Sequence, residues 1–199
     1  MSNENRSMCE DVCQMVYNTD KIANGLMENY KTLFSPLQYK KVNILEIGIL
    51  EGESLHYWDD YFRHSESVIV GLDLNLPQVG FGDRVKVFEC DQNDNERLKS
   101  IAEKYGPYDI VIDDGSHFRK ETENCFNLLL PYVAVGGYYV IEDWAAGYWR
   151  ERPLYNGMVE LINDIVAKIP ELSICESRII LEKNKALAFF RKGETGWQE

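Results

Sequence analysis

The sequence lacks the features of membrane, nucleic-acid-binding and zinc-binding proteins. No apolar run approaches the ~20 residues of a membrane-spanning helix, and the N-terminus has no apolar core typical of a signal peptide. Lys and Arg number 21 against 33 Asp and Glu, a net charge of −12, and such a surface repels phosphate groups. The five cysteines include no CxxC pair. We therefore expect a cytoplasmic protein with reduced, mostly buried thiols and with no membrane or nucleic-acid partner.

The chain also lacks internal repeats and linkers rich in Pro, Gly and Ser, so its 199 residues form one continuous series of elements. Short apolar runs alternate with stretches of helical period. The apolar runs predict strands at 42–47, 67–73, 84–90, 108–113, 137–142, 172–181 and 186–191. Helices are expected at 7–17, at 20–34, around Leu55, Trp58 and Phe62, and at 94–104, 119–133 and 155–168.

This alternation predicts the fold class. Apolar strands separated by helices of ten or more residues favour a parallel sheet with helices on both faces. The turn at 182–185 is too short for a parallel crossover, so the last two strands form an antiparallel hairpin. The expected architecture is an α/β, Rossmann-like, seven-stranded, mostly parallel sheet that ends in this hairpin.

Acidic residues stand at the carboxyl end of each expected parallel strand, where open α/β sheets bind their ligands. These residues are Glu46, Asp73, Asp91, Asp113, Asp114, Glu142 and Asp143. Acids at such positions also cap the helices that follow. Capping explains one or two of them, whereas an acid after every parallel strand in turn favours a ligand site.

The loop after the first strand indicates which kind of cofactor binds. Gly48 and Gly52 are four residues apart, whereas the dinucleotide fingerprint is GxGxxG. A cofactor without a pyrophosphate therefore fits better. Asp73, at the end of the second strand, could accept both hydroxyls of an adenosine ribose. Asp91, after the third strand, could accept a hydrogen bond from the adenine amino group.

Two sets of motifs carry a resemblance to a known family. The series ExGxxxG at 46–52, Gly71-Leu72-Asp73 and Glu89-Cys90-Asp91 resembles the class I S-adenosylmethionine-dependent methyltransferases over residues 42–192. A narrower set is similar to the branch that contains metal-dependent macrolide-sugar O-methyltransferases and cephalosporin-hydroxylase-type proteins. Its motifs are Tyr17-Asn18-Thr19-Asp20-Lys21, the run 57–62, Asp113-Asp114-Gly115-Ser116-His117 and Val140-Ile141-Glu142-Asp143.

The resemblance implies S-adenosylmethionine-dependent O-methylation of a sugar or similar small-molecule hydroxyl, as in natural product biosynthesis. It divides the chain into an N-terminal helical segment, 1–36, expected to be a lid or an oligomer contact, and a methyltransferase domain, 37–199. Together with the strand-end analysis, it places the cofactor on Glu46, Gly48, Asp73, Asp91 and Asp113. It places a magnesium or manganese ion on Asp114, Glu142 and Asp143, with His117 as general base. A homo-oligomer with a glycosylated metabolite as acceptor is expected.

The residue types support a metal on their own terms. Neighbouring strands lie about 4.8 Å apart, so Asp114, Glu142 and Asp143 can approach one point, where they repel each other strongly. A hard dication such as Mg²⁺, Mn²⁺ or Ca²⁺ removes the repulsion. His117 follows Asp114 by three residues and could take the proton of a metal-activated hydroxyl, although a lone histidine is more often a surface residue.

Three other functions share such a sheet. A nicotinamide-dependent dehydrogenase would need the missing glycines, and a non-haem iron oxygenase would need a second histidine near Asp114 and His117. A non-catalytic binding protein would not need the acidic cluster. Tyr17 and Lys21 have the YxxxK spacing of short-chain dehydrogenases, but they precede the cofactor loop, so we do not expect them to act as a catalytic pair.

Overall fold

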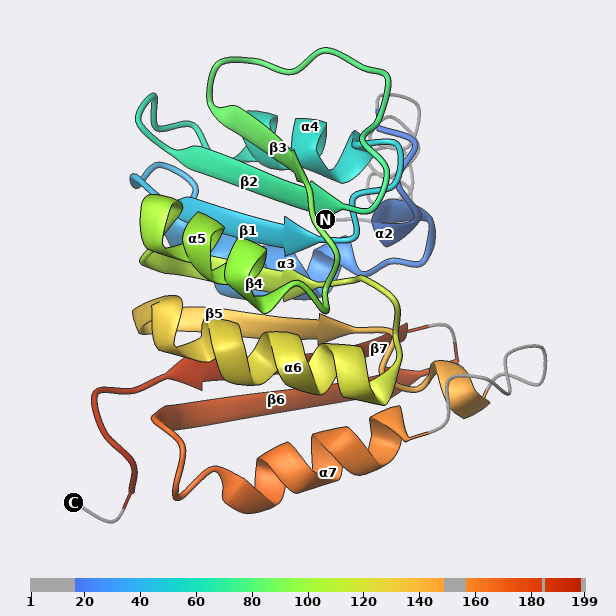
Figure 1. The fold of residues 1–199 in the computed structure, drawn as a ribbon, viewed down its shortest axis with the longest axis vertical. Coiled ribbons are helices and arrows are strands. Elements are labelled where there is room, and N and C mark those ends of the chain that lie inside the picture. Colours follow the sequence, from blue (N-terminus) through green and yellow to red (C-terminus); the bar gives the residue numbers. More distant parts are fainter. Residues whose placement is uncertain (1–16, 149–156, 184, 198–199) are drawn as a thin grey trace, which may run out of the picture.

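A computed structural model describes residues 17–148, 157–183 and 185–197, which include a sheet with the strand order β3-β2-β1-β4-β5-β7-β6 (Figure 1). The strands are β1 (Asn43–Ile47), β2 (Val68–Asp73), β3 (Val85–Glu89), β4 (Tyr108–Asp113), β5 (Val133–Glu142), β6 (Ile174–Glu182) and β7 (Lys185–Lys192). Strands β1 to β5 pair in parallel, and β7 runs antiparallel to both β5 and β6. The seven-stranded sheet and its terminal hairpin confirm the fold predicted from the sequence.

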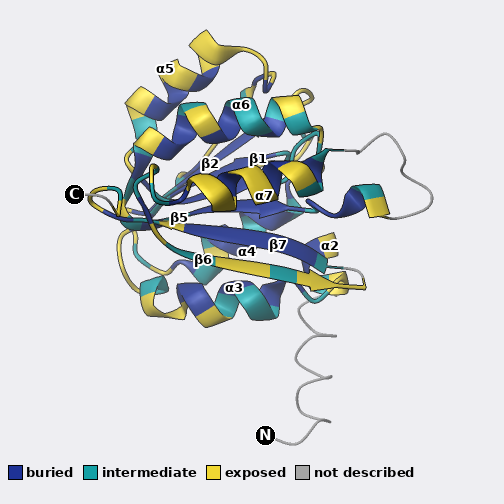
Figure 2. Ribbon diagram, turned by 90° about the horizontal axis from the view of Figure 1, so that it is seen from below, coloured by how far each residue is buried: buried dark blue, intermediate teal, exposed yellow. Residues whose placement is uncertain are grey.

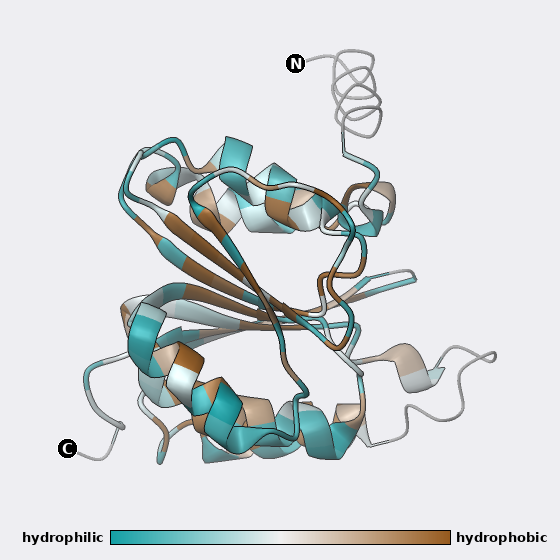
Figure 3. Ribbon diagram, turned by 45° about the horizontal axis from the view of Figure 1, so that its top comes forward, coloured by the Kyte–Doolittle hydropathy of each residue, from teal (hydrophilic) through white to brown (hydrophobic). Residues whose placement is uncertain are grey.

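Helices cover both faces of the sheet, and Figure 3 shows the apolar strands between these two layers. The α-helices are α2 (Asp20–Ala23), α3 (Met27–Phe34), α4 (Glu53–Tyr61), α5 (Asn95–Tyr105), α6 (Arg119–Leu129) and α7 (Met158–Lys168). Among the described residues there are also three short 3-10 helices: η1 (Ser35–Leu37), η2 (Leu130–Tyr132) and η3 (Ala146–Tyr148).

The two layers follow from the alternation of side chains along each strand. In β1, Ile44 faces the layer of α3 and α4, whereas its neighbour Leu45 faces the layer of α5, α6 and α7. The central strands are therefore apolar on both sides. The outermost strand β6 is more exposed than β7, which it covers on one edge (Figure 2).

Two expected helices have different limits in the structure. The helix predicted at 20–34 is broken into α2 and α3 at Gly25, whose φ of +68° lies outside helical geometry. The helix predicted at 119–133 ends at Leu129, because Pro131 turns the chain into η2. Val133, expected on that helix, begins β5 instead.

Several sequence predictions concern residues outside the described ranges. The helix at 7–17 falls almost wholly there, as do Cys9 and Cys13. Of the described cysteines, Cys90 and Cys125 are buried, as expected, and Cys175 is exposed on β6. Within the described residues, no helix combines the length and the apolar character that crossing a membrane requires.

The segment before β1 contributes to the core. Met27, Tyr30, Leu33 and Phe34 of α3 are buried against the sheet beside α4. Helix α2 lies at the edge where the parallel strands end (Figure 1). This N-terminal segment therefore reaches the edge of the sheet at which the candidate site residues gather.

Candidate active site

A cavity of ≈ 1260 Å³ opens at the carboxyl ends of β1 to β4. Its walls are the loops after these strands, the start of α4 and residues 18–21 of the N-terminal segment. Six of the predicted site residues line it, namely Gly48, Asp73, Asp91, Asp114, His117 and Asp143. The other three, Glu46, Asp113 and Glu142, are buried beside it and are not part of its lining. The volume exceeds the range of about 300–1,000 Å³ that is usual for small-molecule sites, so the cavity has room for two ligands side by side.

The loop after β1 is held in shape by a carboxylate from β2. Asp73 Oδ2 accepts hydrogen bonds from the backbone N–H groups of Ile49 (2.9 Å) and Leu50 (3.0 Å). Asp73 Oδ1 accepts one from Asn75 N–H at 3.1 Å. Asp73 therefore organises the loop in this structure, and its contact with a ribose stays a prediction.

Gly48 brings two loops of the cavity into contact. Its φ is +82°, and a Cβ atom built on it would lie 2.1 Å from the carbonyl oxygen of Asp114. No side chain fits between these backbones. The loop after β1 and the loop after β4 therefore form one packed unit.

Backbone strain is concentrated at the cavity. Of the described non-glycine residues, three have a positive φ: Leu50 (+46°), His117 (+55°) and Asp143 (+50°). All three line the cavity. Strained conformations of this kind persist where the surrounding structure holds them, and they cluster at functional sites. Their location supports the cavity as the active site.

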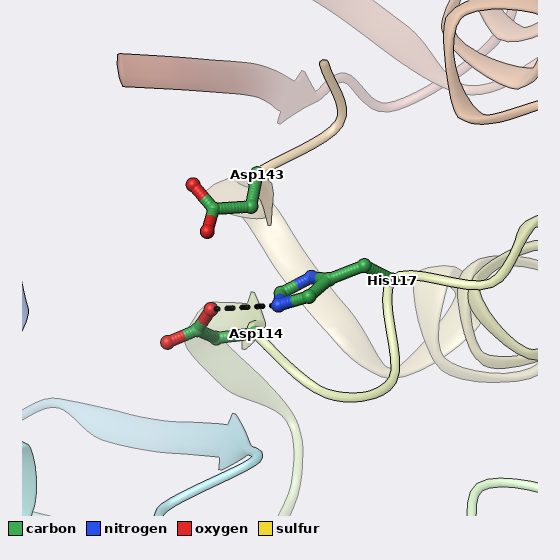
Figure 4. Close-up of side chains that lie close together, drawn as sticks. All are labelled: Asp114, His117 and Asp143. Atoms are coloured by element: carbon green, nitrogen blue, oxygen red, sulfur yellow. Dashed lines mark ion pairs between the residues drawn. The ribbon is translucent and has the colours of Figure 1, made fainter. Parts of the chain in front are cut away.

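Two aspartates and one histidine at the cavity have their side chains close together. Each of Asp114, His117 and Asp143 offers a potential ligand atom, and these atoms all lie within 4.8 Å of one another (Figure 4). Asp114 and Asp143 follow the neighbouring strands β4 and β5, and His117 Nε2 lies 3.9 Å from Asp114 Oδ1. Two of the three predicted metal ligands thus meet, and the predicted general base joins them.

The chemistry of this group fits a divalent cation. Atoms bound to one Mg²⁺ at about 2.1 Å lie at most about 4.2 Å apart, so side-chain shifts of less than about 1 Å close the site. The two carboxylates suit Mg²⁺ or Mn²⁺, whereas imidazole is the commoner ligand of Zn, Cu, Fe and Ni, so His117 fits a base beside such an ion better than a ligand of it. Because both aspartates are only partly buried, water could complete the coordination.

Glu142, the third predicted ligand, is held from the N-terminal segment. Its Oε1 accepts a hydrogen bond from the hydroxyl of Tyr30 and lies 2.9 Å from Lys21 Nζ. Lys21 Nζ also donates a hydrogen bond to Asp114 Oδ2 and lies 3.3 Å from Glu46 Oε1. Glu142 is therefore next to Asp114 but outside the group of Asp114, His117 and Asp143, and its role as a ligand stays a prediction.

The charges of this cluster shift the pKa values of its members. Burial raises the pKa of Asp114, Glu142 raises it further, and Lys21 only partly offsets them. Burial also raises the pKa of Glu142, and Lys21 and Tyr30 oppose that shift. Burial alone would lower the pKa of Lys21, but the combined charges of its three carboxylate neighbours hold it well above the usual value. The site is therefore short of positive charge.

Asp113 lies on the opposite side of the strand from Asp114. It accepts hydrogen bonds from Tyr139 Oη and Gln92 Nε2, each at 3.2 Å. Burial raises its pKa to about 7, although these bonds and one from Gly115 N–H oppose the shift. Asp113 thus supports the loop from inside the sheet, and its predicted contact with the cofactor stays a prediction.

Sequence reasoning missed three residues that shape the site. Lys21 and Tyr30 reach it from the N-terminal segment, across more than 90 residues of chain. Gln92 is buried, lines the cavity and accepts a hydrogen bond from Ser116 N–H at 2.8 Å. Gln92 could have been suspected from its place directly after Asp91, and Lys21 stands in the motif at 17–21 to which no site role was assigned, whereas no local pattern marks Tyr30.

The predicted cofactor carboxylate Glu46 is fully buried under this cluster. Its Oε2 accepts a hydrogen bond from Trp58 Nε1 of α4 at 2.9 Å, and its Oε1 faces Lys21. The structure thus places Glu46 behind the cavity wall.

Of the aromatic residues after β5, Trp144 is buried, Tyr148 is exposed and Trp149 lies outside the described ranges.

Comparison with known proteins gives sequence relatives of one kind. The chain is 39% identical over 128 residues to the mycinamicin VI 2''-O-methyltransferase of Micromonospora griseorubida, which covers 61% of this chain and 32% of the relative. It is 35% identical over 135 residues to the 8-demethyl-8-alpha-L-rhamnosyl tetracenomycin-C 2'-O-methyltransferase of Streptomyces olivaceus, covering 64% and 34% respectively. The chain thus spans about a third of the length of these relatives. No family model matches it.

Solved structures agree with these relatives. The MycE methyltransferase of the mycinamycin biosynthetic pathway, solved in complex with Mg and SAH, superimposes with a TM-score of 0.72 at 32% identity. The match covers 83% of this chain and 49% of that one. An SAH-bound methyltransferase of Podospora anserina matches 98% of this chain with a TM-score of 0.61 at 16% identity, which shows the fold alone. The fold is that of the class I S-adenosylmethionine-dependent methyltransferases, and within it the chain is similar to sugar O-methyltransferases.

Proposed function

We propose that this chain is an S-adenosylmethionine-dependent, divalent-metal-assisted O-methyltransferase that acts on a hydroxyl of a sugar or similar small molecule. The observation that carries the proposal is the convergence of Asp114, His117 and Asp143 in the cavity beside the loop after β1. The similarity to sugar O-methyltransferases supports the same assignment.

The cavity separates two tasks. When bound, S-adenosylmethionine supplies a methyl group on a sulfonium and the metal lowers the pKa of the acceptor hydroxyl. The loop at 48–51, Asp73 and Asp91 would bind the nucleoside part, because they line the cavity and follow β1, β2 and β3, which lie together on one side of β4 and β5 in the sheet. Asp114 and Asp143, with Glu142 as the third ligand predicted from the sequence, would hold the metal on the other side.

His117 is the proposed general base. In its neutral form, the imidazole accepts a proton at Nε2, so it can take the hydroxyl proton as the methyl group is transferred. Its Nε2 lies 3.9 Å from Asp114 Oδ1, and a ring nitrogen lies within 4.8 Å of a carboxylate oxygen of Asp143, so the ring is close to both aspartates. The ring also belongs to the group of potential metal ligands. Metal binding by His117→Gln distinguishes a base from a ligand.

The proposal is tested by the formation of S-adenosylhomocysteine. Purified protein is incubated with S-adenosylmethionine, Mg²⁺ and a panel of glycosylated polyketides with free sugar hydroxyls. We expect product formation with at least one acceptor, loss of it in EDTA, and recovery on adding Mg²⁺ or Mn²⁺. Calorimetry should show binding of S-adenosylhomocysteine and none of NAD. NAD binding without S-adenosylhomocysteine binding would reject the function.

An iron oxygenase is less well supported by the same site. The described residues bring one histidine to the acidic group, whereas the facial triad of such enzymes uses two. Product formation that required Fe²⁺ and oxygen in place of S-adenosylmethionine would favour this alternative.

Three further features of the protein are proposed from the sequence. We expect a homo-oligomer, a cytoplasmic location and a role of residues 1–36 as lid or oligomer contact. The buried packing of α3 against the sheet indicates that at least part of this segment is needed for folding. Light scattering coupled to size-exclusion chromatography tests the oligomer directly.

A further inference from the structure

The ammonium group of Lys21 occupies the centre of a carboxylate cluster. Its side chain is 2% exposed, and three carboxylates surround it: Glu46 at 3.3 Å, Glu142 at 2.9 Å, and Asp114 in a hydrogen bond. The side chain comes from α2, whereas the carboxylates come from the ends of β1, β4 and β5. Lys21 therefore joins the N-terminal segment to three neighbouring strands at one point.

The two oxygens of Asp114 have different neighbours. Oδ2 accepts the hydrogen bond from Lys21, whereas Oδ1 faces His117. Asp114 thus stands between the buried ammonium and the proposed metal position. A cation held at Oδ1 would be separated from the ammonium by one carboxylate.

The charges around Asp114 show why two cations are needed. Glu46, Asp114, Glu142 and Asp143 carry four negative charges when ionised, and Lys21 supplies one positive charge. A divalent ion adds two, which reduces the net charge of the site from −3 to −1. Because the two cations share the same carboxylates at short range, each one lowers the affinity of the site for the other.

We propose that Lys21 is the fixed cation of the metal centre: it balances Glu46 and Glu142, holds Asp114 by one oxygen, and limits how tightly the site binds a divalent ion. The inference rests on the proposed metal site. Lys21 acts through the carboxylates and is therefore a positioning residue. The metal ion would then bind weakly enough to exchange. The carboxylate cluster would stay folded without the metal, because Lys21 remains bound to it.

Two substitutions separate this role from that of a structural anchor. Lys21→Met and Glu46→Gln both break the contact between Lys21 and Glu46, but they change the charge of the cluster in opposite directions. If charge governs the site, Lys21→Met binds Mn²⁺ more tightly than wild type and Glu46→Gln binds it more weakly. If Lys21 is only an anchor, both substitutions weaken binding.

The experiment is a calorimetric titration of Mn²⁺ into the full chain and its variants. We expect about a tenfold tighter Kd for Lys21→Met, about a tenfold weaker one for Glu46→Gln, and an intermediate value for the double variant. Lys41→Met is the matched control, because Lys41 makes an exposed ion pair with Glu66 at the opposite edge of the sheet. Its Kd should equal that of wild type.

The outcomes are distinct. Unchanged or weaker Mn²⁺ binding by Lys21→Met overturns the proposal for Lys21 and leaves the metal site intact. If Lys21→Met does not fold, the double variant decides, because it keeps the net charge of the cluster: Mn²⁺ binding by the double variant that is no tighter than that of Glu46→Gln overturns the proposal. Absence of Mn²⁺ and Mg²⁺ binding in wild type removes the metal from the proposed function, and this role of Lys21 with it.

Discussion

The two edges of the parallel sheet differ in how their polar groups are satisfied. At the amino edge, Asn43 N–H donates to Asp109 Oδ2 at 2.8 Å, and the Asn43 side chain donates to carbonyls of the loop before β4. Each of these hydrogen-bond donors of Asn43 has an acceptor. At the carboxyl edge, several carboxylates share one ammonium, and three non-glycine residues in the described chain have strained backbones.

The difference shows which edge serves folding and which serves chemistry. A matched edge gains stability from each hydrogen bond, whereas an edge with excess negative charge and strain is maintained at a cost in stability. Such a cost is expected where the protein must bind something. Changes at the carboxyl edge should therefore alter activity and metal binding, and matched changes at the amino edge should alter stability slightly.

The largest effect is expected at Asp114. Asp114→Asn removes a charged ligand from the proposed metal site, so Mn²⁺ binding should fall below detection and methyl transfer by more than about 10⁴-fold, because several kcal/mol of charge stabilisation are lost. Activity is followed as S-adenosylhomocysteine formation, with Asp109→Asn at the other end of β4 as the control. Retained Mn²⁺ affinity in Asp114→Asn would contradict the site.

His117→Gln should have the next largest effect. Removal of a positioned base lowers the rate by roughly 10²–10⁴-fold, while the affinities for Mn²⁺ and S-adenosylhomocysteine stay close to wild type. His64→Gln, outside the cavity, controls for the substitution itself. If His117→Gln loses metal together with activity, the imidazole is a ligand, and the assignment of base must move elsewhere.

Gly48→Ala tests the packing of the two loops. The new Cβ would meet the Asp114 carbonyl oxygen, and alanine disfavours the positive φ, so we expect a loss of about 2–4 kcal/mol in the free energy of unfolding. Urea denaturation measures it. Gly80→Ala is the matched control, since nothing lies within 4 Å of its Cβ position, and it should change stability by less than about 1 kcal/mol.

The smallest effect is expected at Asp109 of the amino edge. Burial raises the pKa of this carboxyl, so folding disfavours its ionised form, although the Asn43 bond opposes the shift. Its contribution to stability is present at acid pH and is lost as pH rises through the folded pKa. Relative to Asp109→Asn, wild type should therefore lose stability in urea denaturation as pH rises above about 4, the usual pKa of an aspartate. A gain in the stability of wild type relative to Asp109→Asn as pH rises would contradict this prediction.

The fold could be predicted because its signals are local. The run of apolar residues in β1, the periodic apolar face around Leu55 and Trp58, and the short turn before β7 each fix one element. The start of β5 was missed, because Pro131 and the glycines at 136 and 137 hide a strand that begins at Val133 and has a register shift against β4.

The candidate site could be predicted only in part. The carboxylates stand directly at strand ends, so their convergence follows from the order of the sheet. Lys21 stands at no strand end and meets Asp114 across 93 residues of chain, so its motif at 17–21 does not reveal this contact. Glu142 and Asp143 are neighbours in sequence, yet Asp143 lies beyond the strand with a positive φ and reaches the cavity, whereas Glu142 ends β5 facing Lys21.

The contact of Gly48 with the backbone of Asp114 has a consequence for anyone who redesigns this fold. Grafting a loop from a protein of the same fold onto β1 would displace the strand end that carries Asp114 unless the graft keeps a glycine with the same φ. The loop after β1 and the loop after β4 therefore cannot be exchanged independently of each other. They must be diversified together, in libraries that vary both loops and leave Gly48 unchanged.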